Sequence, residues 1–181
     1  ANIFRFIEWS LLQFPFTHSV AVSKFTQDDL PARMKRHSSV IHHGIDPMFK
    51  ASKKKSSHPG LSKESALLKG SVGPTTFLFF GRSAPQKGFW FLLESLPKFF
   101  EDPSAQKNAR FVLMLSASRE ELKKVDDFLV KKGLEKVVTM KAPVKREDLP
   151  GVLQSASAVV VPSFSEGFGF AAAEAAACRV P

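Results

Sequence analysis

The sequence holds a single cysteine, Cys178, among its 181 residues. One cysteine excludes an intrachain disulfide and fits a reducing compartment. The sequence also lacks the spacing of cysteine and histidine that marks a zinc site, and no apolar run reaches the length of a membrane span. We therefore expect a cytoplasmic protein without a structural metal.

The amino terminus lacks the features of a signal peptide. Residues 1–16 are rich in large apolar side chains, but they include Arg5 and Glu8 and no small-residue cleavage site, and the sequence does not begin with methionine. Apolar residues from Ile3 to Phe14 recur at helical spacing and predict an amphipathic or buried helix. We interpret this stretch as an internal piece of a longer chain.

Acidic residues are few compared with basic ones. The chain carries 26 lysines and arginines against 17 aspartates and glutamates, which gives a net charge of +9. Such a charge predicts attraction to polyanions, anionic lipid surfaces or phosphate-bearing ligands. The basic residues concentrate between Arg33 and Lys55, but aromatics do not interleave with them as a single-strand stacking platform requires. We expect no nucleic-acid partner, and a peripheral association with the inner face of an anionic membrane stays open.

The part of the chain after residue 74 alternates between apolar strand-like runs and amphipathic helix-like runs. A hydrophobic content of 44% is sufficient to bury a core. Repeated strand and helix units predict an α/β fold, a Rossmann-like doubly wound parallel sheet with right-handed crossovers. The expected strands are Phe77–Phe80, Phe111–Leu115, Val137–Met140 and Ala158–Val161, and the expected helices run from Gly88 to about Phe100, over Glu120–Lys131 and Leu149–Ala156, and from the glycines near residue 169 onward.

The part before residue 74 is shorter and divides into a structured stretch and a linker. We expect a strand over Ser19–Val22 and a helix over Lys24–Arg36 that Pro31 kinks or divides, with a second strand from Val40 into a turn. Residues 51–74 are rich in lysine, serine and glycine, with a weak helical pattern at Leu61–Leu68. The predicted organisation is therefore a domain end at 1–50, a linker at 51–74 and a second domain at 75–181.

A glycine-rich turn between a strand and a helix is the strongest candidate for a binding site. Val159 to Val161 form a β-branched run, and Gly167 and Gly169 precede an alanine-rich helix. A helix start of this kind favours anions. Glu166 and Glu174 flank it, and carboxylates beside an anion site suit a ligand that carries both phosphates and hydroxyls, as a sugar nucleotide does. From the residues alone, an ordinary strand-to-helix connection with Glu166 as a capping acid stays equally open.

A second glycine loop, Gly81–Gly88, follows the first strand of the second domain. Its cations Arg82 and Lys87 could converge on a diphosphate, Arg82 as a fork and Lys87 as a point charge. The alternative is that both are surface cations. Ligands of doubly wound sheets bind at the carboxyl ends of the strands, where both glycine loops are expected to lie.

The stretch Glu166-Gly-Phe-Gly-Phe-Ala-Ala-Ala-Glu174, with the tail Ala-Ala-Ala-Cys-Arg-Val-Pro, resembles the signature of the retaining GT-B glycosyltransferases. The similar family is the large one, glycosyltransferase family 4-like, that includes sucrose synthases and bacterial mannosyl- and glucosyltransferases. The resemblance extends to the arginine after Gly81 and to the segment from Val40 to Phe49, while Arg179 departs from the small residue usual there. It implies an incomplete C-terminal, donor-binding domain preceded by the tail of the N-terminal domain.

The resemblance also implies a role for each candidate residue. Arg82 and Lys87, after the strand-ending Gly81, would hold the donor diphosphate, and Glu166 would contact the transferred sugar. Glu174 would bind the ribose hydroxyls, and Val144 would border the base. Backbone amides of the turn would contact sugar and phosphate: Gly167, Phe168, Gly169 and Phe170.

The implied activity is transfer of a hexose from a nucleotide-diphosphate sugar to an unknown sugar or lipid-linked acceptor, with retention of configuration and without a metal cofactor. We expect the chain alone to be inactive. Two other classes stay open: a non-catalytic nucleotide-sugar-binding subunit that needs a partner chain, and a basic nucleic-acid-binding domain. The base, the hexose and the acceptor do not follow from the residues.

Overall fold

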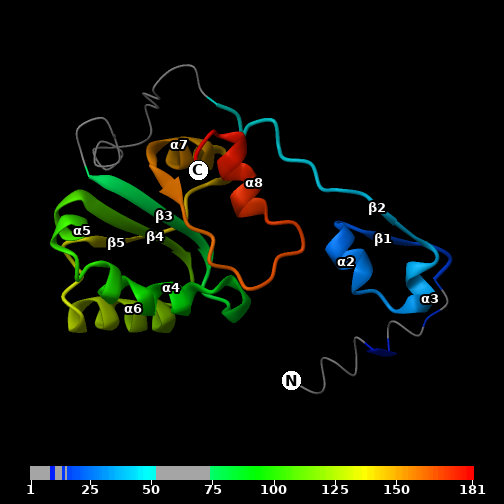
Figure 1. Ribbon diagram of the computed structural model, residues 1–181, viewed down its shortest axis with the longest axis horizontal. Coiled ribbons are helices and arrows are strands. Elements are labelled where there is room, and N and C mark those ends of the chain that lie inside the picture. The colour runs from blue at the N-terminus through cyan, green and yellow to red at the C-terminus, as the bar shows by residue number, and fades with distance from the viewer. Residues whose placement is uncertain (1–8, 11–13, 15, 52–73) are drawn as a thin grey trace. The chain divides into compact units, whose positions relative to one another are not determined.

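The computed structural model describes residues 9–10, 14, 16–51 and 74–181 (Figure 1). The chain forms two compact units, Ala1–Gly44 and Ile45–Pro181. The helix expected over Ile3–Phe14 lies almost wholly outside the described residues, as do the linker and its helical pattern at Leu61–Leu68. The domain boundaries drawn from the sequence stay predictions.

The first unit contains a two-stranded parallel sheet with two short helices between its strands. Strands β1 (Ser19–Ala21) and β2 (Ser38–Val40) pair in parallel, and helices α2 (Lys24–Asp28) and α3 (Ala32–Lys35) connect them. Pro31 is the residue before α3, so of the two expected outcomes the helix is divided, not kinked, since proline supplies no amide for a continuing helix. The strand expected from Val40 onward is wrong in its extent, because the ladder ends at that residue.

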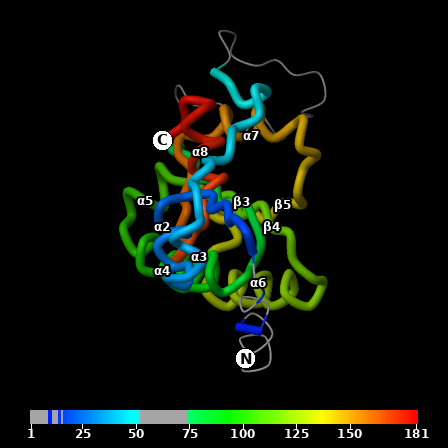
Figure 2. The backbone as a smooth tube through the Cα atoms, turned by 90° about the vertical axis from the view of Figure 1, so that its right-hand side faces the viewer, coloured from blue at the N-terminus to red at the C-terminus, as the bar shows by residue number. Residues whose placement is uncertain are grey.

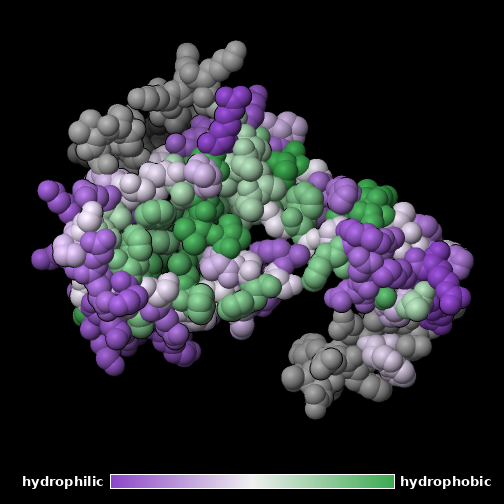
Figure 3. Space-filling view, in the orientation of Figure 1, coloured by the Kyte–Doolittle hydropathy of each residue, from purple (hydrophilic) through white to green (hydrophobic). Residues whose placement is uncertain are grey.

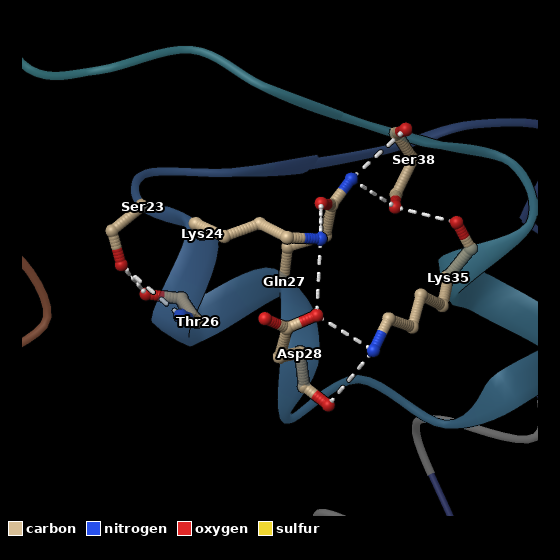
Figure 4. A network of polar contacts seen from close by, with 7 residues as sticks. All are labelled: Ser23, Lys24, Thr26, Gln27, Asp28, Lys35 and Ser38. Carbon is tan, nitrogen blue, oxygen red and sulfur yellow. Dashed lines mark hydrogen bonds and ion pairs between the residues drawn. The ribbon is translucent and has the colours of Figure 1, made fainter.

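Side-chain contacts connect α2 and α3 to each other and to β2 (Figure 4). The side-chain amide of Gln27 donates to both the carbonyl and the hydroxyl oxygen of Ser38, at 3.2 and 2.9 Å. Asp28 accepts from Lys24 at 3.1 Å and from Lys35 at 2.7 Å. These groups are partly solvent-exposed, so each ion pair contributes little to stability.

The second unit contains a four-stranded parallel sheet in the order β5-β4-β3-β6, which confirms the expected α/β fold class. Each predicted strand and helix is present, although β6 is shorter than expected. Helix α5 was not predicted, because its six residues lack apolar periodicity. In chain order the elements are β3 (Thr75–Arg82), η2 (Pro85–Lys87), α4 (Phe89–Phe99), α5 (Pro103–Asn108), β4 (Ala109–Ser116), α6 (Arg119–Lys131), β5 (Val138–Lys141), η3 (Arg146–Asp148), α7 (Leu149–Ser155), β6 (Ala158–Val159) and α8 (Phe170–Ala177).

Helices cover both faces of this sheet, as Figures 1 and 2 show: α4 and α6 lie on one face and α7 and α8 on the other. Successive residues of one strand therefore pack into different cores. Phe79 packs with the first helix pair, and Leu78 packs with the second. Strands buried on both sides read as continuous apolar runs, which is why β3 and β4 were predictable from sequence. Hydrophilic residues cover α6 on the outer edge of the unit (Figure 3).

The strand order places a topological switch point between β3 and β6. From β3 the chain passes to β4 and then β5, and it returns to the other side of β3 as β6. The connections on the two sides of β3 cover opposite faces, so a crevice opens at the carboxyl ends of β3 and β6. The two glycine loops singled out in the sequence follow these two strands.

Candidate functional site

A cleft of about 500 Å³ lies at this switch point, within the second unit. Its walls come from the end of β3, the loop before α4, the turn η3, the segment after β6 and the start of α8. The polar side chains that line it are Arg82, Lys87, Arg146, Ser163, Glu166 and Glu174, and Phe79, Phe80, Gly81, Leu149, Val160, Val161, Phe170 and Ala171 complete the wall.

The two glycine loops lie against each other beside the cleft. Gly88 has a φ of +63°, and a Cβ there would lie 2.0 Å from the carbonyl oxygen of Pro162. The amide of Phe164 donates to the carbonyl of Gln86 at 2.9 Å, and the exposed rings of Phe91 and Phe164 lie 6.0 Å apart. Glycine is required at position 88 both for its backbone conformation and for this close approach.

Lys87 and Glu166 join the two loops through a hydrogen-bonded ion pair. Lys87 Nζ lies 2.7 and 2.9 Å from the two carboxylate oxygens of Glu166, and Ser163 Oγ donates to the first of them at 2.6 Å. Burial raises the pKa of Glu166, but the hydrogen bonds from Lys87 and Ser163 outweigh it, so the pKa lies below its ordinary value. Glu166 is therefore a fixed, ionised acceptor.

Glu174 lies on α8 and is nearly fully buried, with 6% of its side chain exposed. Arg146 NH1 lies 3.3 Å from Glu174 Oε1, and the guanidinium carbon of Arg146 lies 5.1 Å from the ring centroid of Phe49. Burial is the largest influence on Glu174 and holds its pKa above the ordinary value, although Arg146 opposes the effect.

The remaining groups of the cleft favour anions. Arg82 at the end of β3 is exposed and lines the cleft. Helix α8 begins after Gly169, which has a φ of +82° and supplies no side chain to cap the first amides. Phe170 and Ala171, the first residues of the helix, line the cleft. Backbone amides at a helix start and a nearby arginine together suit a phosphate group.

The structure brings six of the ten predicted site residues together on the wall of the cleft: Gly81, Arg82, Lys87, Glu166, Phe170 and Glu174. The other four lie outside its lining: Val144, Gly167, Phe168 and Gly169. Sequence reasoning missed Arg146 and Ser163. Arg146 follows β5 closely, and a cation just after a parallel strand is the signal that could have found it. Ser163 lies three residues before Glu166, a spacing short enough for contact within one turn.

Neither a metal cluster nor a membrane helix occurs in the parts of the chain that the structure describes. No group of three or more histidine, cysteine, aspartate or glutamate side chains is placed to hold a metal ion in these parts. Within the same residues, no helix is both long enough and apolar enough to cross a membrane. The predicted independence from metal stays a prediction.

A doubly wound sheet with cations, carboxylates and a helix start gathered at its switch point has the architecture in which open α/β sheets bind their ligands. The profile of the family described as "Glycosyl transferases group 1" matches residues 74–181. The chain belongs to this family of glycosyltransferases, which confirms the resemblance seen in the sequence.

One curated relative is an uncharacterized glycosyltransferase of Methanocaldococcus jannaschii, 26% identical over 162 residues. The match covers 90% of this chain and 38% of the relative, so the chain spans well under half of the relative's length.

Solved structures show the same fold. The structure of HepE from Anabaena, in complex with UDP and glucose, superimposes with a TM-score of 0.75 at 20% identity, over 100% of this chain and 47% of HepE. The C-terminal domain of LpcC from Francisella tularensis superimposes with a TM-score of 0.58 at 21% identity, over 76% of this chain and 68% of that domain. The second unit therefore has the fold of a GT-B C-terminal domain.

Proposed function

We propose that this chain carries the donor-binding part of a retaining glycosyltransferase, which moves a hexose from a nucleotide-diphosphate sugar to an acceptor. The observation that carries the proposal is the composition of the cleft at the switch point. Cations and a helix start lie beside two buried or half-buried carboxylates. A phosphate group binds to cations and to the amides of a helix start, and sugar hydroxyls donate hydrogen bonds to carboxylates.

The diphosphate, the ribose and the transferred sugar of the donor each have a matching group in the cleft. Arg82, Lys87 and the first amides of α8 would bind the diphosphate, and Glu174 would accept hydrogen bonds from the ribose hydroxyls. Glu166 would contact the transferred sugar. HepE, which shares this fold, has been crystallised with UDP-glucose, and this supports uridine diphosphate as the first nucleotide to test.

The chemistry proposed for this cleft is a same-face displacement. The bond between the anomeric carbon and the diphosphate oxygen breaks, and its electron pair leaves on that oxygen. The acceptor hydroxyl oxygen forms the new bond on the same face, and its proton passes to the leaving phosphate. Arg82 and Lys87 would stabilise the developing charge on the phosphate. Glu166 is held by Lys87 and Ser163, which favours a binding role over attack on the anomeric carbon.

The test is calorimetric titration of the chain with UDP, GDP and ADP, beside Glu174→Ala. We expect one nucleotide to bind selectively, and the substitution to weaken its binding by about 1.5–3 kcal/mol, the scale of a hydrogen bond to a charged group. We expect no sugar transfer by the chain alone, since it spans less than half of its full-length relative.

The matched control is Glu94→Ala, which removes a carboxylate from the exposed face of α4 and should leave binding unchanged. A folded chain that binds no nucleotide, or binds all three equally with and without Glu174, would contradict the donor-site assignment.

A further inference from the structure

Arg146 lines the cleft but has no role among the predictions made from sequence. It opens the turn η3 between β5 and α7, and 57% of its side chain is exposed. Exposed arginines usually have many accessible rotamers, and fixing one of them costs entropy. Here contacts on two sides restrict the guanidinium.

The first contact is with Phe49, a buried residue of the segment before the linker. The guanidinium carbon lies 5.1 Å from the centre of this ring, within the range of a cation–π interaction. The ring itself is fixed, because Phe49 packs into the core formed by α7, α8 and the sheet. It therefore gives Arg146 a rigid surface on which to lie.

The second contact is with Glu174. Arg146 approaches one carboxylate oxygen, Oε1, at 3.3 Å. A carboxylate offers about four acceptor positions over its two oxygens. The contact with Arg146 is made to one oxygen, so it does not itself occupy the acceptor positions of the other. A fixed partner on one oxygen also restricts rotation of the carboxylate.

The charges around Glu174 come from three elements. Arg146 on η3 favours the ionised form, while Asp46, in the segment before Phe49, disfavours it. Cys178 lies one turn further along α8, and its own pKa is raised by burial first and by Glu174 as well. Burial and Asp46 thus both favour the protonated form of Glu174, whereas Arg146 favours the ionised form.

We propose that Arg146 is a positioning residue, held on the ring of Phe49, that keeps the Glu174 carboxylate ionised and turned toward the ribose hydroxyls of a bound nucleotide. The inference rests on the proposed donor site and adds a determinant of selectivity to it. A protonated or rotated Glu174 accepts fewer hydrogen bonds from hydroxyls. Arg146 should therefore control the preference of the cleft for a ribonucleotide over its 2′-deoxy form.

The experiment compares the wild-type chain with Arg146→Met, which keeps a long apolar stem for the ring and removes the charge. UDP and 2′-deoxy-UDP are titrated from about pH 5 to about pH 8. This range lies above the ordinary glutamate pKa, where a glutamate with a raised pKa changes its protonation. We expect the substitution to weaken UDP about tenfold at neutral pH, one decade in the dissociation constant. The preference over 2′-deoxy-UDP should fall, and UDP affinity should be lost at a higher pH than in the wild type.

Two further variants separate the charge of Arg146 from its planar shape and from the net charge of the chain. Arg146→Lys keeps the charge without the planar fork, so it should restore the wild-type pH dependence but only part of the ribose preference. Lys132→Met removes one positive charge from the end of α6, at the opposite edge of the sheet, and should change neither. If Arg146→Met fails to fold, the lysine variant still tests the ribose preference.

The outcomes separate the two proposals. If the wild type binds UDP and depends on Glu174, but Arg146→Met keeps the same pH profile and ribose preference, the role of Arg146 is wrong and the donor site stands. If the folded wild type binds no nucleotide, the donor site is wrong, and the role of Arg146 fails with it.

Discussion

The ionised side chain of Glu174 suits the proposed nucleotide site, but its burial lowers the stability of the folded chain. Burial raises its pKa above that of an unfolded glutamate, so the folded chain binds this proton more readily than the unfolded chain does. The stability contributed by this group is therefore present at acid pH and is lost as the pH rises through the raised pKa. Above the raised pKa the chain carries a buried charge whose hydration is only partly replaced by Arg146.

We predict that Glu174→Gln raises the unfolding temperature at neutral pH while it weakens nucleotide binding. The amide keeps the shape of the side chain and removes the buried charge. The gain should shrink as the pH is lowered, because the wild-type glutamate is then protonated too. Thermal unfolding followed by circular dichroism from acid to neutral pH checks this, with Glu94→Gln as the exposed control. A lower unfolding temperature at neutral pH would show that the ion pair with Arg146 outweighs the burial.

Which residues of the cleft could be predicted depends on how far apart their partners lie in the sequence. Glu166 and Glu174 could be predicted because they lie close together in the sequence, one in the turn before α8 and the other in that helix. Arg146 and Phe49 carry no such signal, because their contact arises only when distant parts of the chain fold together. The same limit applies to the pairing of Lys87 with Glu166, since each was predicted separately as a ligand contact and nothing in the sequence joined them.

At the junction between η2 and α4, Gly88 leaves no space for a larger side chain. Gly88 has a left-handed backbone conformation, and its α-carbon faces the carbonyl of Pro162 in the segment after β6. Gly133, after α6, has nearly the same φ, +66°, but a Cβ at this position would have nothing within 4 Å. The two glycines therefore separate backbone strain from close packing.

We predict that Gly88→Ala destabilises the chain by about 2–5 kcal/mol, the sum of left-handed strain and overpacking. Gly133→Ala should cost only about 1–2 kcal/mol, from strain alone. Urea denaturation of both variants measures the difference. Equal losses would mean that the contact between Gly88 and Pro162 relaxes without cost.

The elements predicted best are those whose apolar residues are continuous or periodic along their length. Strands β3 and β4 lie between two helical layers and read as apolar runs, and α6 has both an apolar face and a capping box at Ser118 and Glu121. Helix α5 has no apolar face and was not predicted. The only sequence signals for it are at its start, the cap Asp102 and the proline after it. Strand β6 was predicted too long, because only its first residues pair with β3.

At the scale of the whole molecule, the cleft and its supporting core belong to one unit. Every residue that lines the cleft lies in Ile45–Pro181, as does Phe49 beneath Arg146. Among the described residues of the first unit the sheet has two strands, and so few strands give little independent stability.

We predict that residues 45–181 alone fold and bind UDP with the affinity of the complete chain, whereas residues 1–44 alone show no cooperative unfolding. Calorimetric titration and thermal unfolding of the two pieces test this, with Glu174→Ala in the larger piece as the control for site-specific binding. Loss of UDP binding in the larger piece, with a preserved unfolding transition, would show that the first unit contributes to the site.

The ion pair between Lys87 and Glu166 joins residues 79 positions apart in the sequence. During synthesis the chain leaves the ribosome from its amino terminus, so β3, its cationic loop and the strands β4 and β5 emerge well before β6 and α8. A nascent chain that has already formed most of its sheet therefore has only half of the cleft. If the proposed donor site is correct, a nucleotide stabilises this protein only after α8 has emerged, and the earlier stages of folding proceed without help from the ligand.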